Sequence, residues 1–183
     1  MEGRIVIVMS QRIEGFAPIV FEDSEVLLLG TLPGAVSLER NYYYADDGNY
    51  FWQFFSEYTE CEKPRNWEDV RNVLQKAKVA LWDIYESAVR VDEQNNATSK
   101  DSDITDVCWN DIETFLGENP QIKRVGILGK KAYKEFVKKY PAFAKKCVYL
   151  PSTSGSNAAQ WGGKPINRSR NGWKSFVSFI ENT

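Results

Sequence analysis

The sequence predicts a three-layer α/β/α fold in which a short, mostly parallel central sheet lies between two layers of helices. One observation is the Val-Leu-Leu-Leu run that ends at a Gly/Pro turn, because parallel strands buried on both faces form continuous apolar runs. The other is that helix-like stretches separate most of the apolar runs, as in the βαβ units of a doubly wound sheet. The strands are expected at Glu25–Gly30, Val79–Ile84, Val125–Leu128 and Val148–Leu150.

Amphipathic spacing predicts the helices. In the last of them, Trp173, Phe176, Val177 and Ile180 share one face, and Asn171 is a candidate N-cap. The helices are expected at Tyr50–Tyr58, Trp67–Lys76, Asp106–Leu116, Lys130–Tyr140 and Gly172–Glu181. The apolar, β-branched segment Arg4–Val8 is a candidate for a further strand whose placement is open, and the polar stretch Val91–Asp103 is expected to be a surface loop.

The size and composition are those of one globular domain spanning residues 1–183. The chain is 43% hydrophobic and 26% charged, in the ordinary range for a soluble protein. No apolar run approaches the ~20 residues needed to cross a bilayer, and the N-terminal segment lacks the features of a signal peptide. We therefore expect a cytoplasmic monomer.

The residues that the chain lacks exclude several kinds of chemistry. It contains no histidine, which removes Ser-His and Cys-His triads and the commonest metal ligand. Its three cysteines, Cys61, Cys108 and Cys147, lie far apart and form no CxxC pair. We therefore expect neither a metal site nor a cofactor, and any catalysis must use Asn, carboxylates, hydroxyls, Lys or Tyr.

Charge is distributed unevenly along the chain. Residues 1–122 contain 10 Lys and Arg against 23 Asp and Glu, whereas residues 123–183 contain 13 against 2. The net charge of −2 therefore hides an acidic first part and a basic last part. A basic region of this kind favours a phosphate-bearing partner, although a merely solvated helix face over Lys130–Lys146 would give the same count.

In an open parallel sheet, ligands bind outside the carboxyl ends of the strands. Gly30 to Gly34 (Gly-Thr-Leu-Pro-Gly) follows the first strand, and its glycines permit a close backbone approach while Pro33 stiffens the path. The next segment, Asn41–Trp52, combines aromatic residues with two asparagines, a composition suited to stacking and hydrogen-bonding a planar base. The loops expected at this edge are Thr31–Asn49, Tyr85–Thr105, Gly129–Lys131 and Pro151–Asn171.

Taken in order, these segments resemble the uracil-DNA glycosylase superfamily. Within it they are most similar to the hypoxanthine-DNA (deoxyinosine) glycosylases, which carry a Gly-Ser/Thr-x-Pro-Gly loop and an Asn-x-Phe-Trp sequence. The resemblance runs from about Phe16 to the C-terminus. It is carried by Ser24–Gly34, Ser37-Leu38, Tyr43-Tyr44-Ala45, Asn49 with Phe51-Trp52, Leu81-Trp82-Asp83, Asp101-Ser102-Asp103-Ile104, Gly129-Lys130-Lys131-Ala132 and Leu150-Pro151-Ser152-Thr153-Ser154.

The resemblance implies a monofunctional DNA glycosylase of base excision repair. Such an enzyme extrudes a deaminated base, hypoxanthine or uracil, and hydrolyses its N-glycosidic bond without a metal or cofactor. Asn49 would be catalytic, its amide oxygen orienting the attacking water. The implied base-binding residues are Gly30, Thr31, Leu32, Pro33, Gly34, Tyr43, Tyr44 and Phe51, and the implied DNA-binding residues are Pro151, Ser152, Thr153, Ser154, Lys164, Arg168 and Arg170.

Three positions depart from the family pattern. Leu32 stands where classical uracil enzymes carry an aspartate, and Leu128 where many relatives carry an asparagine. Gly155 replaces a proline and is expected to loosen the loop that follows Leu150–Ser154, which corresponds to the second motif of the family pattern. These departures keep open a non-catalytic nucleic-acid-binding module, and the acidic first part of the chain keeps open a nucleosidase that acts on small molecules.

Single residues also have structural alternatives. Asn49 immediately precedes a predicted helix, where Asn commonly caps the first turn. Trp52 and Phe55 are expected to be core residues of that helix. The Ser/Thr-rich tetrapeptide Pro151–Ser154 is of a kind that often forms only local hydrogen bonds.

Overall fold

The computed structural model describes residues 12–91, 98, 100–156 and 178–181. Four parallel strands form the central sheet in the order β3-β2-β6-β7. Their bounds are β2 Val26–Gly30, β3 Val79–Asp83, β6 Arg124–Leu128 and β7 Cys147–Leu150. Each strand matches a predicted one to within one residue at either end, so the expected parallel sheet is confirmed.

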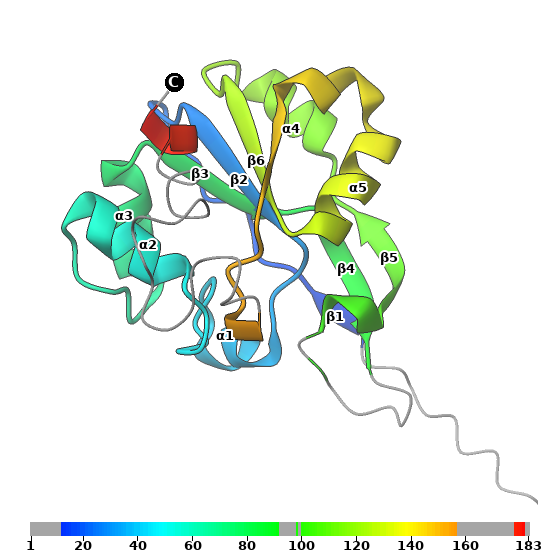
Figure 1. Cartoon of the computed structure of the whole chain (residues 1–183), viewed down its shortest axis with the longest axis horizontal. Helices are drawn as coiled ribbons and strands as arrows, with labels where there is room; N and C mark the ends of the chain where they lie inside the picture. Colours follow the sequence, from blue (N-terminus) through cyan, green and yellow to red (C-terminus); the bar gives the residue numbers. More distant parts are fainter. Residues whose placement is uncertain (1–11, 92–97, 99, 157–177, 182–183) are drawn as a thin grey trace, which may run out of the picture.

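Helices cover both faces of this sheet, as the three-layer prediction requires (Figure 1). One face carries α2 (Phe51–Thr59) and α3 (Trp67–Lys76), and the other carries α4 (Ile112–Glu118) and α5 (Lys130–Lys139). The predicted bounds of α3 are correct, because Asn66 caps the helix by accepting a hydrogen bond from the Asp69 backbone N–H at 2.9 Å.

The alternation along β2 explains why two cores form. Leu28 packs with the aromatic residues of α2 and with α3, whereas Leu27 and Leu29 face α4 and α5. Successive side chains of a strand point to opposite faces, so an all-apolar strand supplies both layers. All five residues of β2 are buried, and β2 lies between β3 and β6 in the interior of the sheet.

A second, antiparallel sheet in the order β1-β4-β5 was not predicted. It consists of β1 (Arg12–Glu14), β4 (Tyr85–Arg90) and β5 (Ile104–Trp109). The chain leaves β3 at Ile84, whose N–H donates to the Gly30 carbonyl at 3.0 Å, and then runs directly into β4. β4 therefore lies next to the loop that follows β2.

The helix expected at Asp106–Leu116 is wrong in its first half. Residues up to Trp109 belong to β5, and α4 begins only after Asp111, whose side chain accepts a hydrogen bond from the Thr114 N–H. Pairing with β4 decides the matter, because cross-strand hydrogen bonds satisfy the backbone that a helix would otherwise satisfy. The short helix α1 (Ala35–Arg40) and the 3-10 turns at Asp101–Asp103 and Pro141–Lys146 were also not predicted.

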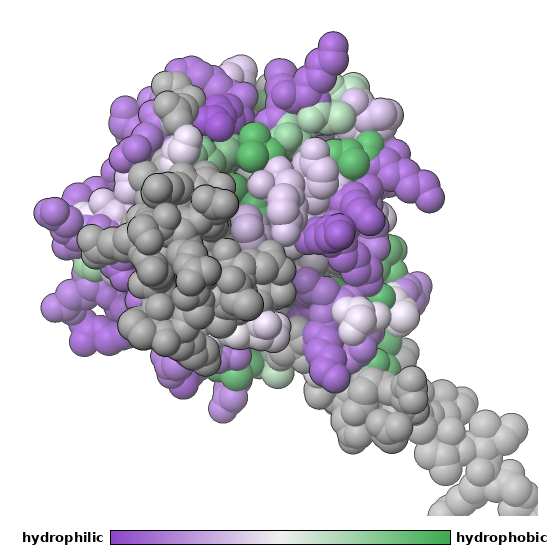
Figure 2. Space-filling view, in the orientation of Figure 1, coloured by the Kyte–Doolittle hydropathy of each residue, from purple (hydrophilic) through white to green (hydrophobic). Residues whose placement is uncertain are grey.

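Some predictions fall outside the described residues. Arg4–Val8 and most of Gly172–Glu181 are among them, although residues 178–181 are helical, with Phe179 and Ile180 buried in the α2/α3 core. Much of the expected loop 91–103 also lies outside. Within the described part of the chain, no helix has both the length and the apolar character needed to cross a bilayer. Figure 2 shows hydrophilic side chains over much of the described surface on this face, with apolar side chains between them.

The packing at Gly126 in β6 leads to a prediction about stability. A Cβ at this position would lie 2.7 Å from Phe179 Cε1 and 2.8 Å from methyl carbons of Leu28 and Leu150. Gly126→Ala should therefore lower the free energy of unfolding by about 1–3 kcal/mol through overpacking. Chemical denaturation measures this change.

The matched control is Gly117→Ala on α4, where a Cβ would meet nothing within 4 Å. The same chemical change should there stabilise the protein by up to about 1 kcal/mol, because alanine favours a helix over glycine. Equal stability of the two variants would contradict the packing described for β6.

Candidate active site

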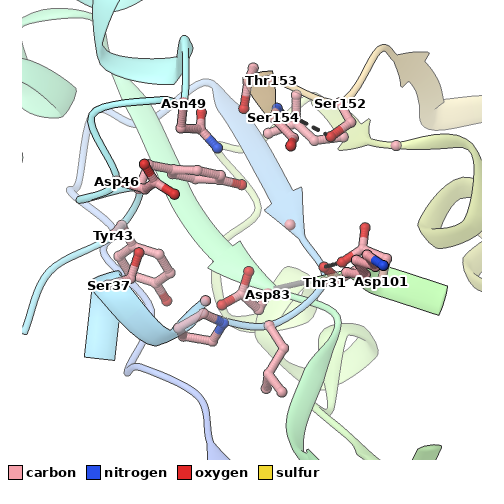
Figure 3. Close-up of a pocket in the computed structure, with 18 of the residues that line it drawn as sticks. Thr31, Ser37, Tyr43, Asp46, Asn49, Asp83, Asp101, Ser152, Thr153 and Ser154 are labelled. Atoms are coloured by element: carbon pink, nitrogen blue, oxygen red, sulfur yellow. Dashed lines mark hydrogen bonds between the residues drawn. The ribbon is translucent and has the colours of Figure 1, made fainter. Parts of the chain in front are cut away.

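A cavity of about 520 Å³ opens at the carboxyl ends of the central strands (Figure 3). Pockets of this size commonly hold one small ligand. Its walls come from the segments after β2, β6 and β7, which the sheet topology predicted to converge, and from the ends of β3 and β4 with the residues before β5. The loop expected over Tyr85–Thr105 is wrong in its first part, because Tyr85–Arg90 forms β4. Among the residues that line it are Gly30, Thr31, Leu32, Pro33, Gly34, Tyr43, Tyr44, Asp46, Asn49, Asp83, Arg90, Lys100, Asp101, Leu128, Lys130, Tyr149, Ser152, Thr153 and Ser154.

The loop after β2 takes its shape from a buried arginine. Arg90, at the end of β4, is 2% exposed and donates to the carbonyls of Pro33 at 3.0 Å and Leu32 at 3.1 Å. Leu32 is itself 6% exposed, so its backbone carbonyl, and not its side chain, supplies the polar contact. Hydrogen bonds from a charged donor to buried carbonyls are among the stronger ones, and they fix the path of the loop.

The carboxylate of Asp101, in the 3-10 turn before β5, also binds this loop. Asp101 accepts a hydrogen bond from the Thr31 hydroxyl at 2.9 Å and lies 3.5 Å from the Arg90 guanidinium. Lys131 of α5 donates to the Asp101 backbone carbonyl at 2.8 Å. The Thr31 side chain is therefore fixed by a hydrogen bond. Polar contacts of Asp101 connect this wall of the pocket to β4 and to α5.

Gly30 ends β2 at the point where two polar side chains converge. A Cβ on Gly30 would lie 2.4 Å from Asp83 Oδ1 and 2.6 Å from the Tyr44 hydroxyl. Both oxygens therefore occupy the space that a side chain would take at this position. Glycine is required here because of the close approach and not because of a left-handed backbone.

Asp83 is a buried acid at the end of β3. It is 3% exposed, and its Oδ2 has no hydrogen bond partner in the described part of the chain. Burial raises the pKa of the Asp83 carboxyl to about 7, with Arg90 opposing the shift and Asp101 reinforcing it. A carboxyl group with this pKa can carry or release a proton near neutral pH.

Tyr44 supplies the aromatic surface of the cavity. Its ring stacks on Phe51 with centroids 3.9 Å apart and planes 12° apart, and its backbone has a left-handed φ of 54°. A bulky residue rarely adopts this conformation, and such outliers concentrate at functional sites. Phe51 is fully buried and does not line the cavity, so the prediction that Phe51 contacts the base is wrong. Tyr44 lines the cavity, and Phe51 supports its ring from behind.

Tyr43 forms part of the cavity wall, and its hydroxyl is bound by the protein backbone. Its hydroxyl donates toward the backbone carbonyls of Ala17 at 3.1 Å and Phe16 at 3.3 Å, and its ring stacks on Trp67. Burial raises the pKa of the Tyr43 hydroxyl far above its usual range. These contacts give Tyr43 a structural role beside the pocket.

Asn49 lies on the cavity wall immediately before α2. Its amide oxygen accepts a hydrogen bond from the Phe51 N–H at 2.9 Å, so part of the helix-capping alternative is correct. The amide nitrogen is turned toward the cavity in Figure 3. The Asn49 amide oxygen was expected to orient a water. One of its lone pairs already accepts from Phe51, so a water would have to donate to the other.

The second motif packs directly against the Asn49 segment. The Tyr50 N–H donates to the Thr153 carbonyl at 2.9 Å. A Cβ on Gly155 would lie 2.5 Å from the Gly48 carbonyl oxygen, so a glycine allows the two loops to meet. Gly155, which was expected to loosen this loop, instead permits its close packing on residue 48.

The predicted DNA-binding residues divide into two groups. Ser152, Thr153 and Ser154 line the cavity, and Pro151 precedes them at the end of β7. The local hydrogen bonds of the structural alternative are also present, because the Ser154 N–H donates to the Ser152 hydroxyl at 3.3 Å. Lys164, Arg168 and Arg170 lie outside the described residues. Lys100 and Lys130 contribute positive charge at the rim.

Sequence reasoning gave no role to Asp83, Arg90 or Asp101, which form the polar floor of the site. Asp83 and Asp101 fall in segments that carry the family resemblance, and an acid directly after an apolar strand was a signal that could have been used. Arg90 offered no signal, because its strand was not predicted. Within the described ranges, no three His, Cys, Asp or Glu side chains are grouped so as to hold a metal ion.

The fold and the site define an α/β protein with a polar, aromatic-walled pocket at the carboxyl edge of a parallel sheet. The profile of the uracil DNA glycosylase superfamily matches residues 18–177, and the chain belongs to that superfamily. This assigns it to the DNA glycosylases, in agreement with the resemblance that its motifs carry.

Particular relatives point to one branch of the superfamily. The chain is 30% identical over 162 residues to a hypoxanthine DNA glycosylase of Methanosarcina barkeri, covering 87% of this chain and 94% of that protein. It is 28% identical over 144 residues to a hypoxanthine DNA glycosylase of Methanosarcina acetivorans, covering 78% and 87%. The fold is also similar, with a TM-score of 0.67, to the solution NMR structure of a candidate uracil DNA glycosylase from M. acetivorans, at 22% identity and covering 94% and 98% of the two chains.

The raised pKa of Asp83 predicts a pH dependence of stability. A carboxyl whose pKa rises on folding from 3.8 to about 7 binds more protons in the folded state, so stability falls as pH rises between those values. The chain has no histidine, so few other groups titrate between pH 5 and 7. The free energy of unfolding should fall across this range by on the order of 1 kcal/mol per pH unit.

Asp83→Asn should flatten this slope, because the amide does not titrate. The control is Asp47→Asn at an exposed carboxylate, whose pKa is lowered by hydrogen bonds from Lys63 and Arg40. That group affects stability only below its ordinary pKa, so the control should keep the wild-type slope. Denaturant titrations at several pH values would refute the ionisation assigned to Asp83 if all three proteins gave the same slope.

Proposed function

We propose that this protein excises a deaminated base, hypoxanthine or uracil, from DNA during base excision repair. It would extrude the nucleotide into the cavity, hydrolyse the N-glycosidic bond and leave an abasic site without cutting the strand. One observation carries the proposal: a single cavity brings the amide of Asn49 together with the aromatic ring of Tyr44. Hypoxanthine is favoured as the substrate by the two Methanosarcina relatives that bear that name.

The described residues support the steps of such a reaction. A planar base would stack on the face of Tyr44 opposite Phe51, and the backbone of Gly30–Gly34, which Arg90 holds in place, would contact its edge. Loss of the base generates positive charge on the sugar, and a water positioned by the Asn49 amide would add to C1′ of that sugar. Ser152, Thr153 and Ser154 would donate to the phosphates that flank the extruded nucleotide.

A non-catalytic binding module remains the second candidate. Leu32 and Leu128 line the cavity with apolar side chains where relatives carry polar ones, and the Asn49 oxygen already accepts one hydrogen bond. Such a module would bind lesion-containing DNA and release no base. The assay described next separates the two functions.

The direct test uses end-labelled duplex oligonucleotides that contain hypoxanthine, uracil or no lesion. Alkali after incubation should cleave the strand at the lesion, whereas samples without alkali should stay intact, as expected for a monofunctional glycosylase. Binding of the lesion duplexes without alkali-sensitive products would establish the binding module instead. A labelled free nucleoside tests the nucleosidase alternative in the same series.

The catalytic role of Asn49 can be separated from its role at the start of α2. Asn49→Ala should lower single-turnover excision by about 10²–10³, the usual loss for one preorganised polar group. It should also destabilise the fold by about 0.5–2 kcal/mol, because the bond to the Phe51 N–H is lost.

Asn49→Asp is the matched variant, because its carboxylate keeps an acceptor for the Phe51 N–H and can still hold a water. Its thermal stability should stay near that of the wild type, with partial excision. A destabilised Asn49→Ala variant that excises at the full rate per folded molecule would leave Asn49 with a purely structural role.

A further inference from the structure

Asp83 is the most unusual group in the pocket, and the mechanism above does not use it. It ends β3 at the floor of the cavity, and no described residue donates a hydrogen bond to its Oδ2. A carboxyl group that served only the fold would be expected to have its oxygens satisfied, because a buried polar atom without a partner costs free energy. The fold is held here through the backbone instead, where Asn110 donates to the Asp83 carbonyl at 2.8 Å.

The charged and titratable groups around Asp83 come from three elements. Tyr43 and Tyr44 face it from the loop before α2, Arg90 from β4, and Asp101 from the 3-10 turn at Asp101–Asp103. Arg90 is already bound to the Leu32 and Pro33 carbonyls and lies within ion-pair distance of Asp101. Burial, reinforced by the negative charge of Asp101, outweighs the attraction of Arg90, so the pKa of the Asp83 carboxyl is raised.

Purine and pyrimidine bases differ in how they leave the sugar. Hypoxanthine has a basic ring nitrogen, N7, which can accept a proton as the bond from N9 to the sugar breaks. Uracil has no basic ring nitrogen, and it leaves with negative charge spread over its carbonyl oxygens. A neutral acid at the pocket floor would therefore assist a purine more than a pyrimidine.

We propose that the Asp83 carboxyl is the general acid that protonates N7 of a departing purine base in this pocket. The inference rests on the proposed function and adds a catalytic residue to it. Asp83 offers its proton from a position that solvent barely reaches, where the Tyr44 hydroxyl converges on the same point beside Gly30. Asp83 lines the cavity, so an extruded base would come within reach of its carboxyl group.

The step balances without any further reactant. The Asp83 proton moves to N7 while the bond between C1′ and N9 breaks and its electron pair stays with the base. Water adds to C1′ and releases one proton to solvent, which leaves an abasic sugar. The Asp83 carboxylate then regains a proton from solvent, so the net reaction consumes one water and releases free hypoxanthine.

The test compares two duplexes, one containing hypoxanthine and one containing uracil, under single-turnover conditions from pH 5.5 to 8.5. The ratio of hypoxanthine to uracil excision rates should fall with rising pH, approaching tenfold per pH unit once Asp83 is ionised. Asp83→Asn keeps the size of the side chain but cannot give up a proton. It should lower this ratio by about 10²–10⁴, the usual contribution of a general acid, and remove its pH dependence.

A third duplex, containing 7-deazahypoxanthine, tests the proton acceptor directly. Its position 7 is a C–H group, so the wild-type enzyme should excise it about as slowly as Asp83→Asn excises hypoxanthine. Asp83→Asn should cause no additional loss on that substrate. The rate of the wild-type enzyme on this duplex can also be compared with its own rate on hypoxanthine, so the protonation of N7 is tested even if the variant does not fold.

The outcomes distinguish this inference from the proposed function. Absence of excision from both natural substrates would refute the proposed function. Excision of both with one pH profile, excision of uracil alone, or full activity on 7-deazahypoxanthine would overturn the role of Asp83 alone. Asp47→Asn, at an exposed carboxylate paired with Arg40 and Lys63, is the control and should behave as the wild type.

Discussion

The candidate site depends on one buried charge, the guanidinium of Arg90. Arg90 is 2% exposed and donates through its two terminal nitrogens to the Leu32 and Pro33 carbonyls, while its Nε has no hydrogen-bond partner among the described residues. The same bonds give these carbonyls their partner and fix the loop that follows β2. These two hydrogen bonds therefore fix both the position of Arg90 and the shape of the pocket wall. The antiparallel sheet matters to function because it delivers this residue.

Two glycines, which have no side chain, then allow the polar groups of the site to approach one another closely. Gly30 leaves room for the Asp83 carboxyl and the Tyr44 hydroxyl, and Gly155 lets the second motif meet the carbonyl of Gly48. The result is a pocket whose wall carries an amide and whose floor carries an acid, in a chain that has no histidine. Burial, and not a neighbouring base, tunes the acid, as expected where a low-dielectric environment disfavours the charged carboxylate.

Local pattern predicted the regular parts of the fold well. β2 and α3 were predicted because an apolar run bounded by Gly and Pro, or an amphipathic stretch, is decided within about ten residues. β5 was missed, because Ile104–Trp109 is a strand only through pairing with β4, a partner that the sequence did not reveal. Tertiary contacts routinely override local propensity in short segments of this kind.

The sequence by itself determined the family, the sheet edge at which the site lies and the residues Gly30–Gly34, Tyr44, Asn49 and Ser152–Ser154 that line it. The order of the motifs along the chain indicates the family. The order of the strands indicates the edge, since the carboxyl ends of parallel strands must meet on one side of the sheet. Only the tertiary structure placed Tyr44 over Phe51 and brought Arg90 and Asp83 to the pocket floor. The reason is physical: burial, hydrogen-bond partners and the ionisation of a carboxyl depend on neighbours in space, which the sequence around a residue does not specify.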